Sequence, residues 1–245
     1  MDYIKIFKKI KNEIQNHPLL ELVTFKINEG LVDIEKTKEE LYECLGYFET
    51  VQMESVFEFY KQCNGLVIKY KISSDIDEYS ELSKSYPDID FSINKDAEIG
   101  SINILPFEDV FIYEQNYFDK SNEGEDYMHF GNYTYKGNSF GKILFVFDLF
   151  SDTNCMAFVP DENKEEPKVI QLLDYYVVWN SSRVTFFESY LNFLAVTRGL
   201  IDSRGMLLDY YSKCKDNPLI LKEVPYGSDF EPILFKELKS NTTKN

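Results

Sequence analysis

The chain has 245 residues, of which 44% are hydrophobic and 16% aromatic, so its composition predicts a folded globular protein rather than a disordered one. Its formal charge of -16, from 26 Lys and Arg against 42 Asp and Glu, repels phosphate backbones and anionic lipid surfaces. Nucleic-acid and membrane partners are therefore not expected and a basic protein partner is favoured, although acidity also serves simply to keep an aromatic-rich protein soluble.

Hydropathy and cysteine spacing bear on the compartment of the protein. The longest apolar run, Ile143 to Phe147, is too short to cross a bilayer, and the N-terminal sequence has neither a long apolar stretch nor a small-residue cleavage site. We therefore expect a cytoplasmic protein. The cysteines form no Cys-x-x-Cys pair, which argues against a zinc site or a disulfide framework. They are Cys44, Cys63, Cys155 and Cys214.

The first part of the chain predicts three helices. Apolar residues at spacings of three and four indicate an amphipathic helix over residues 2 to 16, and the β-prone sequence LLELVTFKI follows it. A second helix is predicted over residues 35 to 45, with Gly46 as its stop. A third is predicted over residues 51 to 63. Its buried stripe is Met53, Val56, Phe59, Tyr60 and Cys63.

Asn64 and Gly65 predict a junction between this third helix and a strand. Gly accepts the left-handed backbone conformation that satisfies the last carbonyls of a helix at little cost. The sequence LVIKYKI, residues 66 to 72, follows directly and has the period-two pattern of a strand. The pair is therefore interpreted as the end of a helix that leads into a sheet.

The middle of the chain predicts short strands in succession. Residues 73 to 98 are acidic and lack a sustained period, which indicates an inserted loop. A strand is predicted in IGSINILPF, stopped by Pro106, and a short helix or turn in EDVFIYEQNYFD. Four β segments follow, MHFGNYTY, KILFVFDL, NCMAFVPD and KVIQLLDYYVVW. Consecutive strands with short links favour an antiparallel meander, and ILFVF, apolar on both faces, is expected to be its central strand.

The last clear element is a helix in VTFFESYLNFLAVTRGL. Thr185 and Glu188 have the spacing of a capping box, and Gly199 closes the helix. A weaker helical segment near MLLDYYSKC and an irregular, proline-containing stretch follow.

These elements together predict an α+β fold, a mostly antiparallel meander sheet packed by several helices. Residues 1 to 199 are expected to form one domain with an N-terminal helix and an insertion near residues 73 to 98. Residues 200 to 245 are expected to form a C-terminal extension packed on the same domain.

The sequence carries no catalytic signature. His17 lies at a predicted helix end and His129 in a predicted strand, so a structural role is favoured for both. The segment Gly137 to Gly141 lacks the Lys and the following helix of a phosphate-binding loop. The acids from Asp148 to Asp152 and from Asp161 to Glu166 fall in predicted turns, where solvated carboxylates are expected. We therefore predict a non-enzymatic protein with no cofactor and no metal.

Aromatic residues interleaved with acids mark a candidate partner-binding surface. They occur in FIYEQNYFD, residues 111 to 119, and in EGEDYMHFGNYTY, residues 123 to 135. Tyr and Phe offer a large contact area at low entropic cost, and flanking acids select a basic partner. The residues predicted to face a partner are Tyr113, Tyr117, Asp126, Tyr133 and Tyr135.

The aromatic side chains of these two segments have an alternative role, which is to fill the core beneath a β-sheet. Read as one strand, the second segment places Met128, Phe130, Asn132 and Thr134 on one face. His129, Tyr133 and Tyr135 then share the other face. One of the two faces must be buried, and the sequence leaves open which.

Four short motifs follow one another along the chain. Asn64-Gly65 lies between a helix and a strand, Leu105-Pro106 ends the next strand, and Phe147-Asp148 ends a strand of the meander. The closing helix is Phe-rich, with Thr185, Phe186, Phe187, Phe193 and Leu194. In this order the motifs resemble the SUKH superfamily, which includes fungal Smi/Knr-type regulators and many bacterial toxin-immunity proteins. The similarity covers roughly residues 37 to 197, and the chain departs from the family pattern at LGYFETVQMES, which lacks a Leu-Pro pair.

The resemblance implies an α+β fold and a non-enzymatic role, the binding and blocking of a cognate toxin, often a nuclease or deaminase. The charge of -16 fits an inhibitor of a basic, nucleic-acid-degrading toxin. Two alternatives stay open: a regulatory scaffold or adaptor of the same fold, and a hydrolase that uses two facing carboxylates. The partner's identity, the interface and the oligomeric state also stay open.

Overall fold

The computed structural model divides the chain into two compact units, each built from separate stretches of sequence. Unit 1 comprises Met1–Lys26, Val67–Ile102 and Leu191–Asn245, and unit 2 comprises Ile27–Leu66 and Asn103–Tyr190. The structure describes residues 2–29, 32–36, 39, 53–76, 84–86, 96–111, 127–130, 133–136, 145–151, 154–159, 166–173, 176–177, 185–207 and 231–236. The predicted division into residues 1 to 199 and 200 to 245 stays a prediction.

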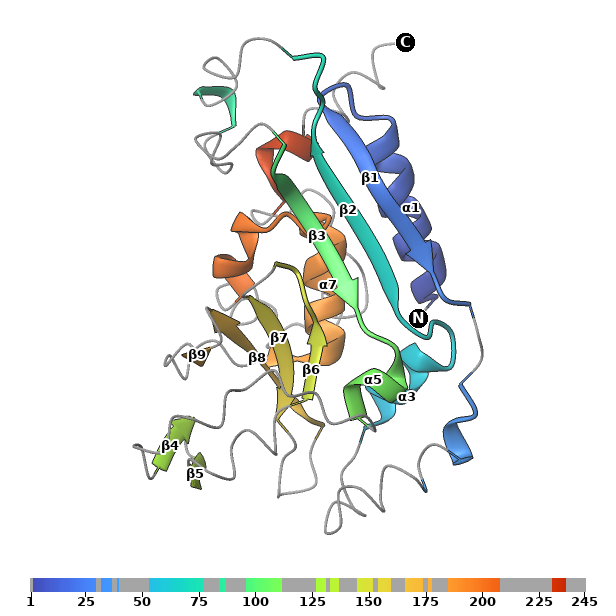
Figure 1. Cartoon of the computed structure of the whole chain (residues 1–245), viewed down its shortest axis with the longest axis vertical. Coiled ribbons are helices and arrows are strands. Elements are labelled where there is room, and N and C mark those ends of the chain that lie inside the picture. Colours follow the sequence, from blue (N-terminus) through green and yellow to red (C-terminus); the bar gives the residue numbers. More distant parts are fainter. Residues whose placement is uncertain are drawn as a thin grey trace. The chain divides into compact units, whose positions relative to one another are not determined.

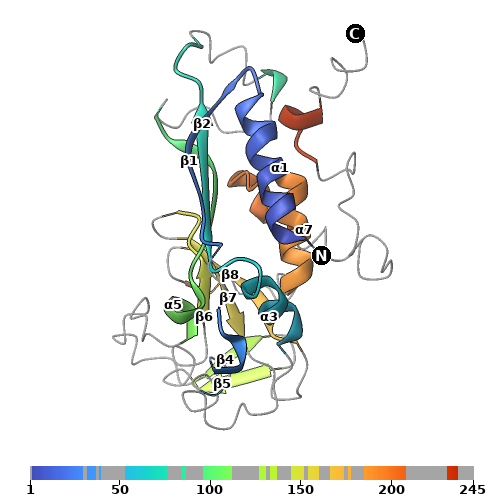
Figure 2. The same cartoon turned by 90° about the vertical axis from the view of Figure 1, so that its right-hand side faces the viewer.

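Helix α1, Tyr3–Gln15, opens unit 1 and confirms the predicted N-terminal helix (Figure 1). The Asp2 side chain caps this helix by accepting a hydrogen bond from the Lys5 amide at 2.9 Å. Its buried stripe is Tyr3, Phe7, Ile10 and Ile14. Figure 2 shows the helix running along one face of strands β1, Leu20–Ile27, and β2, Leu66–Ile72.

The strands of unit 1 lie in the order β1, β2, β3, with β3 at Glu98–Ile104. The Ser73 amide, just after β2, donates to the Leu19 carbonyl, just before β1, so these two strands are antiparallel. The ring of Tyr70 on β2 lies so close to Gly100 of β3 that a side chain at residue 100 would overlap it. The residues that β2 buries alternate, as predicted, and are Leu66, Ile68, Tyr70 and Ile72.

The chain after helix α7, Phe187–Thr197, completes unit 1. Gly199 has φ +74, which confirms the predicted stop of the helix. The Ser101 amide donates to the Gly199 carbonyl at 2.9 Å, so the chain leaving the helix pairs with β3. A 3-10 helix, Asp202–Met206, follows.

Unit 2 contains the remainder of the meander. Its strands are β4 (Tyr127–Phe130), β5 (Tyr133–Lys136), β6 (Phe145–Asp148), β7 (Cys155–Val159), β8 (Lys168–Leu173), β9 (Tyr176–Val177) and β10 (Thr185–Phe186). Strands β6, β7 and β8 pair antiparallel in sequence order, and β9 and β10 both pair with β8. Ile104, the last residue of β3, pairs with Asp148 of β6. This order confirms the predicted α+β class with an antiparallel meander sheet.

Two helices of unit 2 lie where the sequence predicted helical segments. Helix α3 spans Glu54–Tyr60, within the predicted range of residues 51 to 63. All members of its predicted stripe are buried: Met53, Val56, Phe59, Tyr60 and Cys63. Helix α5, Phe107–Phe111, begins directly after Leu105-Pro106. The predicted helix over residues 35 to 45 and the insertion at 73 to 98 lie mostly outside the described residues.

The predicted capping box at the start of α7 is wrong. Thr185 lies in β10 and pairs with Val169 of β8, and the helix begins only at Phe187. Thr and Phe suit a pleated strand, and β8 offers them a pairing edge. Sheet pairing therefore overrides the local capping pattern.

The segment MHFGNYTY folds as a hairpin and not as one strand. Strands β4 and β5 form a two-stranded sheet of their own. The register pairs are Tyr127 with Lys136, Met128 with Tyr135, His129 with Thr134 and Phe130 with Tyr133. The two faces expected of a single strand therefore do not apply to this segment. Gly131-Asn132 between the strands is the hairpin signal that our one-strand interpretation missed.

None of the helices in the described ranges is both long enough and apolar enough to span a bilayer.

Candidate functional site

The Asn-Gly and Leu-Pro pairs lie against each other in unit 2. The Asn64 side chain accepts a hydrogen bond from the Phe107 amide at 2.8 Å and so positions the start of α5. Gly65 has φ +89, and a Cβ there would lie 2.9 Å from both the Ile104 carbonyl oxygen and the Pro106 nitrogen. The positive φ and this close approach each favour glycine. The predicted helix-to-strand junction is confirmed, and contact with the end of β3 is an added reason for the glycine.

The backbone of Leu105 connects this pair to helix α3 and to strand β6. Its carbonyl accepts a hydrogen bond from the Tyr60 hydroxyl at 3.0 Å. Its amide donates to the Phe147 carbonyl at 2.8 Å. The Leu-Pro motif is therefore bonded on one side to the helix before Asn-Gly and on the other to the strand that ends in Phe-Asp.

Asp148 is fully buried at the end of β6, with 0% of its surface exposed. One carboxylate oxygen accepts a hydrogen bond from the Asn103 amide at 2.8 Å, and the other accepts from the Tyr190 hydroxyl. A buried carboxylate needs such donors because its desolvation is costly. Our expectation of a solvated acid at this position is wrong. Asp148 instead connects β3 and α7 to β6.

Phe187, the first residue of α7, brings the closing helix to the other motifs. Its ring lies edge-on to Phe59 at 5.4 Å, Phe147 at 5.4 Å and Phe158 at 5.1 Å between centroids. Such edge-to-face contacts add to the stabilisation from burial. We term the set Asn64-Gly65, Leu105-Pro106, Phe147-Asp148, Phe187 and Tyr190 the motif junction.

Two buried thiols and a buried phenol border the motif junction. Burial raises the pKa of Cys63 to about 12, and burial together with the nearby Asp148 carboxylate raises the pKa of Cys155 to about 12. Burial also raises the pKa of Tyr60 well above its usual range. All three groups stay protonated near neutral pH, so neither thiol is a thiolate nucleophile there.

Glu166 is a second acid that we expected in a solvated turn, and that expectation is also wrong. It is half-buried, and its carboxylate accepts hydrogen bonds from the Ser55 amide at 3.0 Å and the Ser55 hydroxyl at 2.8 Å. Burial raises its pKa, the Ser55 hydrogen bonds lower it, and the charges of Glu54 and Glu188 raise it further. Glu166 therefore caps the start of α3 from a distant part of the sequence.

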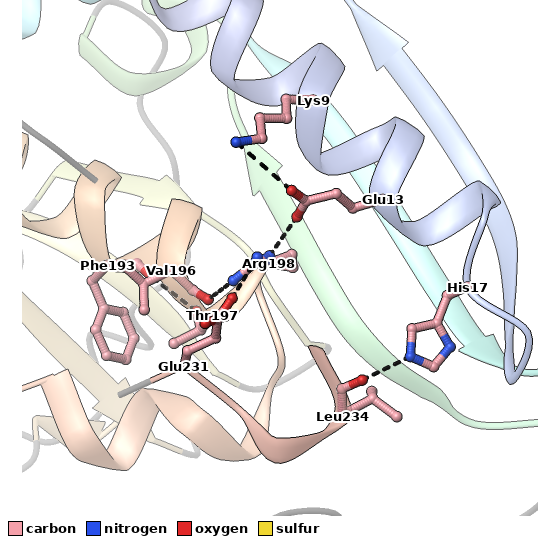
Figure 3. Close-up of polar contacts among 9 residues, drawn as sticks. All are labelled: Lys9, Glu13, His17, Phe193, Val196, Thr197, Arg198, Glu231 and Leu234. Carbon is pink, nitrogen blue, oxygen red and sulfur yellow. Dashed lines mark hydrogen bonds and ion pairs between the residues drawn. The ribbon is translucent and has the colours of Figure 1, made fainter. Parts of the chain in front are cut away.

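Unit 1 has a charged cluster that our sequence analysis did not predict (Figure 3). Arg198 is 1% exposed and lies just after α7 with φ 54. Its Nε lies 2.7 Å from Glu13 Oε2 and its Nη2 lies 2.8 Å from Glu231 Oε1. The guanidinium also donates to the Val196 carbonyl, and Lys9 lies 3.9 Å from the other oxygen of Glu13. We term Arg198, Glu13 and Glu231 the Arg198 cluster.

The partners of Arg198 lie 185 and 33 positions away in the sequence, so no local spacing predicts the cluster. The available signal was an arginine directly after a largely apolar helix. Such a residue is expected to pair with acids when the helix is buried.

The predicted partner-facing residues are only partly covered by the structure. Tyr113, Tyr117 and Asp126 lie outside the described residues. Tyr133 and Tyr135 lie on β5. Their role in partner binding stays a prediction.

Among the described residues, no group of three or more His, Cys, Asp or Glu side chains is placed to hold a metal ion. Comparison of the chain with protein-family models, with curated proteins and with solved structures gave no match. The motif junction and the Arg198 cluster are therefore interpreted from their own contacts.

Proposed function

We propose that the chain is a non-enzymatic protein-binding module, an immunity protein of the SUKH type that binds and neutralises a cognate toxin in the cytoplasm. The observation that supports this proposal is the motif junction. Each of the four motifs is short enough to occur by chance. In unit 2, however, Gly65 lies against Leu105-Pro106, Leu105 bonds Phe147, and the Phe147 ring contacts Phe187 at the start of the closing helix. Bonds connect Asn64 to Phe107, Leu105 to Phe147 and Tyr190 to Asp148. Motifs that belong to one family pattern are expected to pack together in this way.

The partner in this proposal is a basic protein. A net charge of -16 speeds the encounter with a positively charged surface, and added salt screens that attraction. A nucleic-acid-degrading toxin fits because its substrate-binding surface must itself be basic. Association is therefore expected to slow and weaken as ionic strength rises.

The test pairs the chain with the toxin-like protein encoded beside its gene. Co-expression is expected to restore the growth of cells that express this protein, and the two proteins are expected to co-purify. Growth inhibition that persists, together with the absence of a complex, would contradict the proposal. Binding of a neighbouring protein that is not toxic would instead favour the regulatory adaptor.

The predicted interface has its own test. Substituting both Asp126→Ala and Tyr133→Ala is expected to weaken toxin binding while the circular dichroism spectrum stays unchanged. The matched control is Ile233→Ala in unit 1, where the side chain is 38% exposed and loss of its packing is tolerated. Equal binding by all three proteins would remove these residues from the interface and leave the immunity function to the growth assay.

A further inference from the structure

The segment from Glu231 to Lys236 occupies unit 1 as a short peptide would. Residues 233 to 236 are helical, and the Phe235 amide bonds the Pro232 carbonyl at 3.0 Å. Glu231, Pro232, Leu234 and Phe235 are buried, whereas Ile233 and Lys236 are exposed. Leu234 and Phe235 belong to the helical turn, and Glu231 and Pro232 directly precede it. We term residues 231 to 236 the terminal segment.

Unit 1 holds the terminal segment through a different contact at Glu231, Leu234 and Phe235. The Glu231 carboxylate pairs with Arg198 at 2.8 Å. The Leu234 carbonyl accepts a hydrogen bond from His17 Nε2 at 2.8 Å (Figure 3). The Phe235 ring lies edge-on to His17 at 5.8 Å and Tyr70 at 6.4 Å, and the Arg198 guanidinium lies over it at 5.0 Å.

Each receiving residue has a second anchor that does not involve the terminal segment. Arg198 is bonded to Glu13 and to the Val196 carbonyl. His17 Nδ1 accepts a hydrogen bond from the Leu19 amide at 3.1 Å, which leaves the proton on Nε2 for Leu234. Tyr70 is part of β2 and lies against β3. The receiving surface is therefore organised by the rest of unit 1, as preorganised binding sites are.

We propose that His17, Tyr70 and Arg198 form a peptide-binding site whose resident ligand is the chain's own terminal segment. The ligand class is a short peptide in which an acid is followed three and four positions later by leucine and an aromatic residue, with the acid just before a single helical turn and the last two residues within it. A partner segment of this class gains access only when the terminal segment leaves. This inference does not depend on the immunity function.

Arg198 gives the site its selectivity for an acid. Its buried charge is balanced by Glu13 and Glu231 together. A peptide with lysine at the first position would bring a second cation next to the guanidinium, which costs far more in a desolvated site than in water. An unbranched apolar residue there would leave the charge of Arg198 less well compensated.

The test uses the full chain with its terminal segment disabled by Glu231→Ala, Leu234→Ala and Phe235→Ala. The probe is a synthetic peptide with the natural sequence of residues 228 to 240, titrated by calorimetry. The disabled chain is expected to bind this peptide at least about tenfold more tightly than the natural chain, because the attached segment competes at a high effective concentration. The matched control is the full chain with Ile233→Ala, an exposed position of the same segment, which should bind the peptide as weakly as the natural chain.

A second probe peptide carries Glu231→Lys and is expected to bind the disabled chain at least about tenfold more weakly than the natural peptide. Failure of the folded, disabled chain to bind the natural peptide would overturn the proposal, as would equal affinity for the two peptides. If the disabled chain does not fold alone, the natural peptide should restore its circular dichroism spectrum and raise its Tm, and the lysine peptide should not. No recovery with the natural peptide would equally overturn the proposal.

Discussion

The motif junction of unit 2 and the Arg198 cluster of unit 1 connect distant parts of the chain by different means. In the motif junction, the bonds join side chains to backbone groups, one backbone group to another, or a neutral hydroxyl to one carboxylate, and aromatic rings pack around them. In the Arg198 cluster, a buried guanidinium pairs with Glu13 and Glu231. One region depends on backbone geometry, and the other depends on charge balance.

This difference predicts how each region responds to substitution. The motif junction is disrupted when an added side chain does not fit. Its atoms are closely packed, so the added volume must displace the end of a strand. A buried ion pair fails when one member is removed, because the remaining charge is left without compensation. The cluster is therefore the more sensitive to single charge changes, and the junction to changes of volume.

Removal of Arg198 is expected to have the largest effect. Arg198→Met leaves the Glu231 carboxylate, only 1% exposed, without its cation, and this should cost about 4 kcal/mol of unfolding free energy. Urea unfolding followed by circular dichroism measures the loss. Adding Glu231→Leu removes the carboxylate that Arg198 balanced, so the double variant should recover most of the unfolding free energy lost by Arg198→Met. Equal losses in the single and double variants would show that the charge balance is not what stabilises unit 1.

A side chain at residue 65 is expected to break the motif junction. Gly65→Val combines an unfavourable positive φ with a clash against the Ile104 carbonyl and Pro106, for a loss of about 3 kcal/mol by the same urea measurement. Gly205→Ala is the matched control, because no atom lies within 4 Å of a Cβ at that position. A loss at residue 65 no greater than that at residue 205 would contradict the backbone interpretation.

Alkaline pH should destabilise unit 2 through Cys63 and Cys155, which both lie there. Their pKa rises from 9.0 to about 12 in the folded chain, so between these values the unfolded chain loses thiol protons that the folded chain keeps. The contribution of the two thiols to the unfolding free energy is therefore fully present below about pH 9 and is lost as pH rises through this window. Between pH 8 and pH 10 the natural chain should lose stability more steeply than a Cys63→Ala, Cys155→Ala double variant, by on the order of 1 kcal/mol per thiol. Parallel pH profiles of the two proteins would refute this.

The sequence predicted the elements whose signals are local. The buried stripe of α1, the alternation along β2 and the glycine at residue 65 all follow from periodicity or turn chemistry within a few residues, and the structure confirms each. The meander order followed from strands joined by short links. The start of α7 was wrong because Thr185 found a pairing partner in β8, which a capping pattern cannot register.

For the candidate sites, the sequence identified the four motifs but not the bonds between them. Asp148 and Glu166 are of residue types that are also common in solvated turns. Only the folded chain places the donors Tyr190 and Ser55 beside them, 42 and 111 positions away. A buried carboxylate and an exposed one look alike in a sequence, because the difference lies in neighbours that arrive through folding.

By itself, then, the amino-acid sequence determined the α+β class, the main helices and strands, and the glycine that joins α3 to β2. These depend on interactions among neighbouring residues, which act before distant parts of the chain meet. The tertiary structure alone decided that Asp148 is buried, that Arg198 pairs with Glu13 and Glu231, and that the terminal segment lies between His17 and Arg198. Desolvation makes charged groups seek whichever partners the fold brings near, and the order of residues along the chain does not specify those partners.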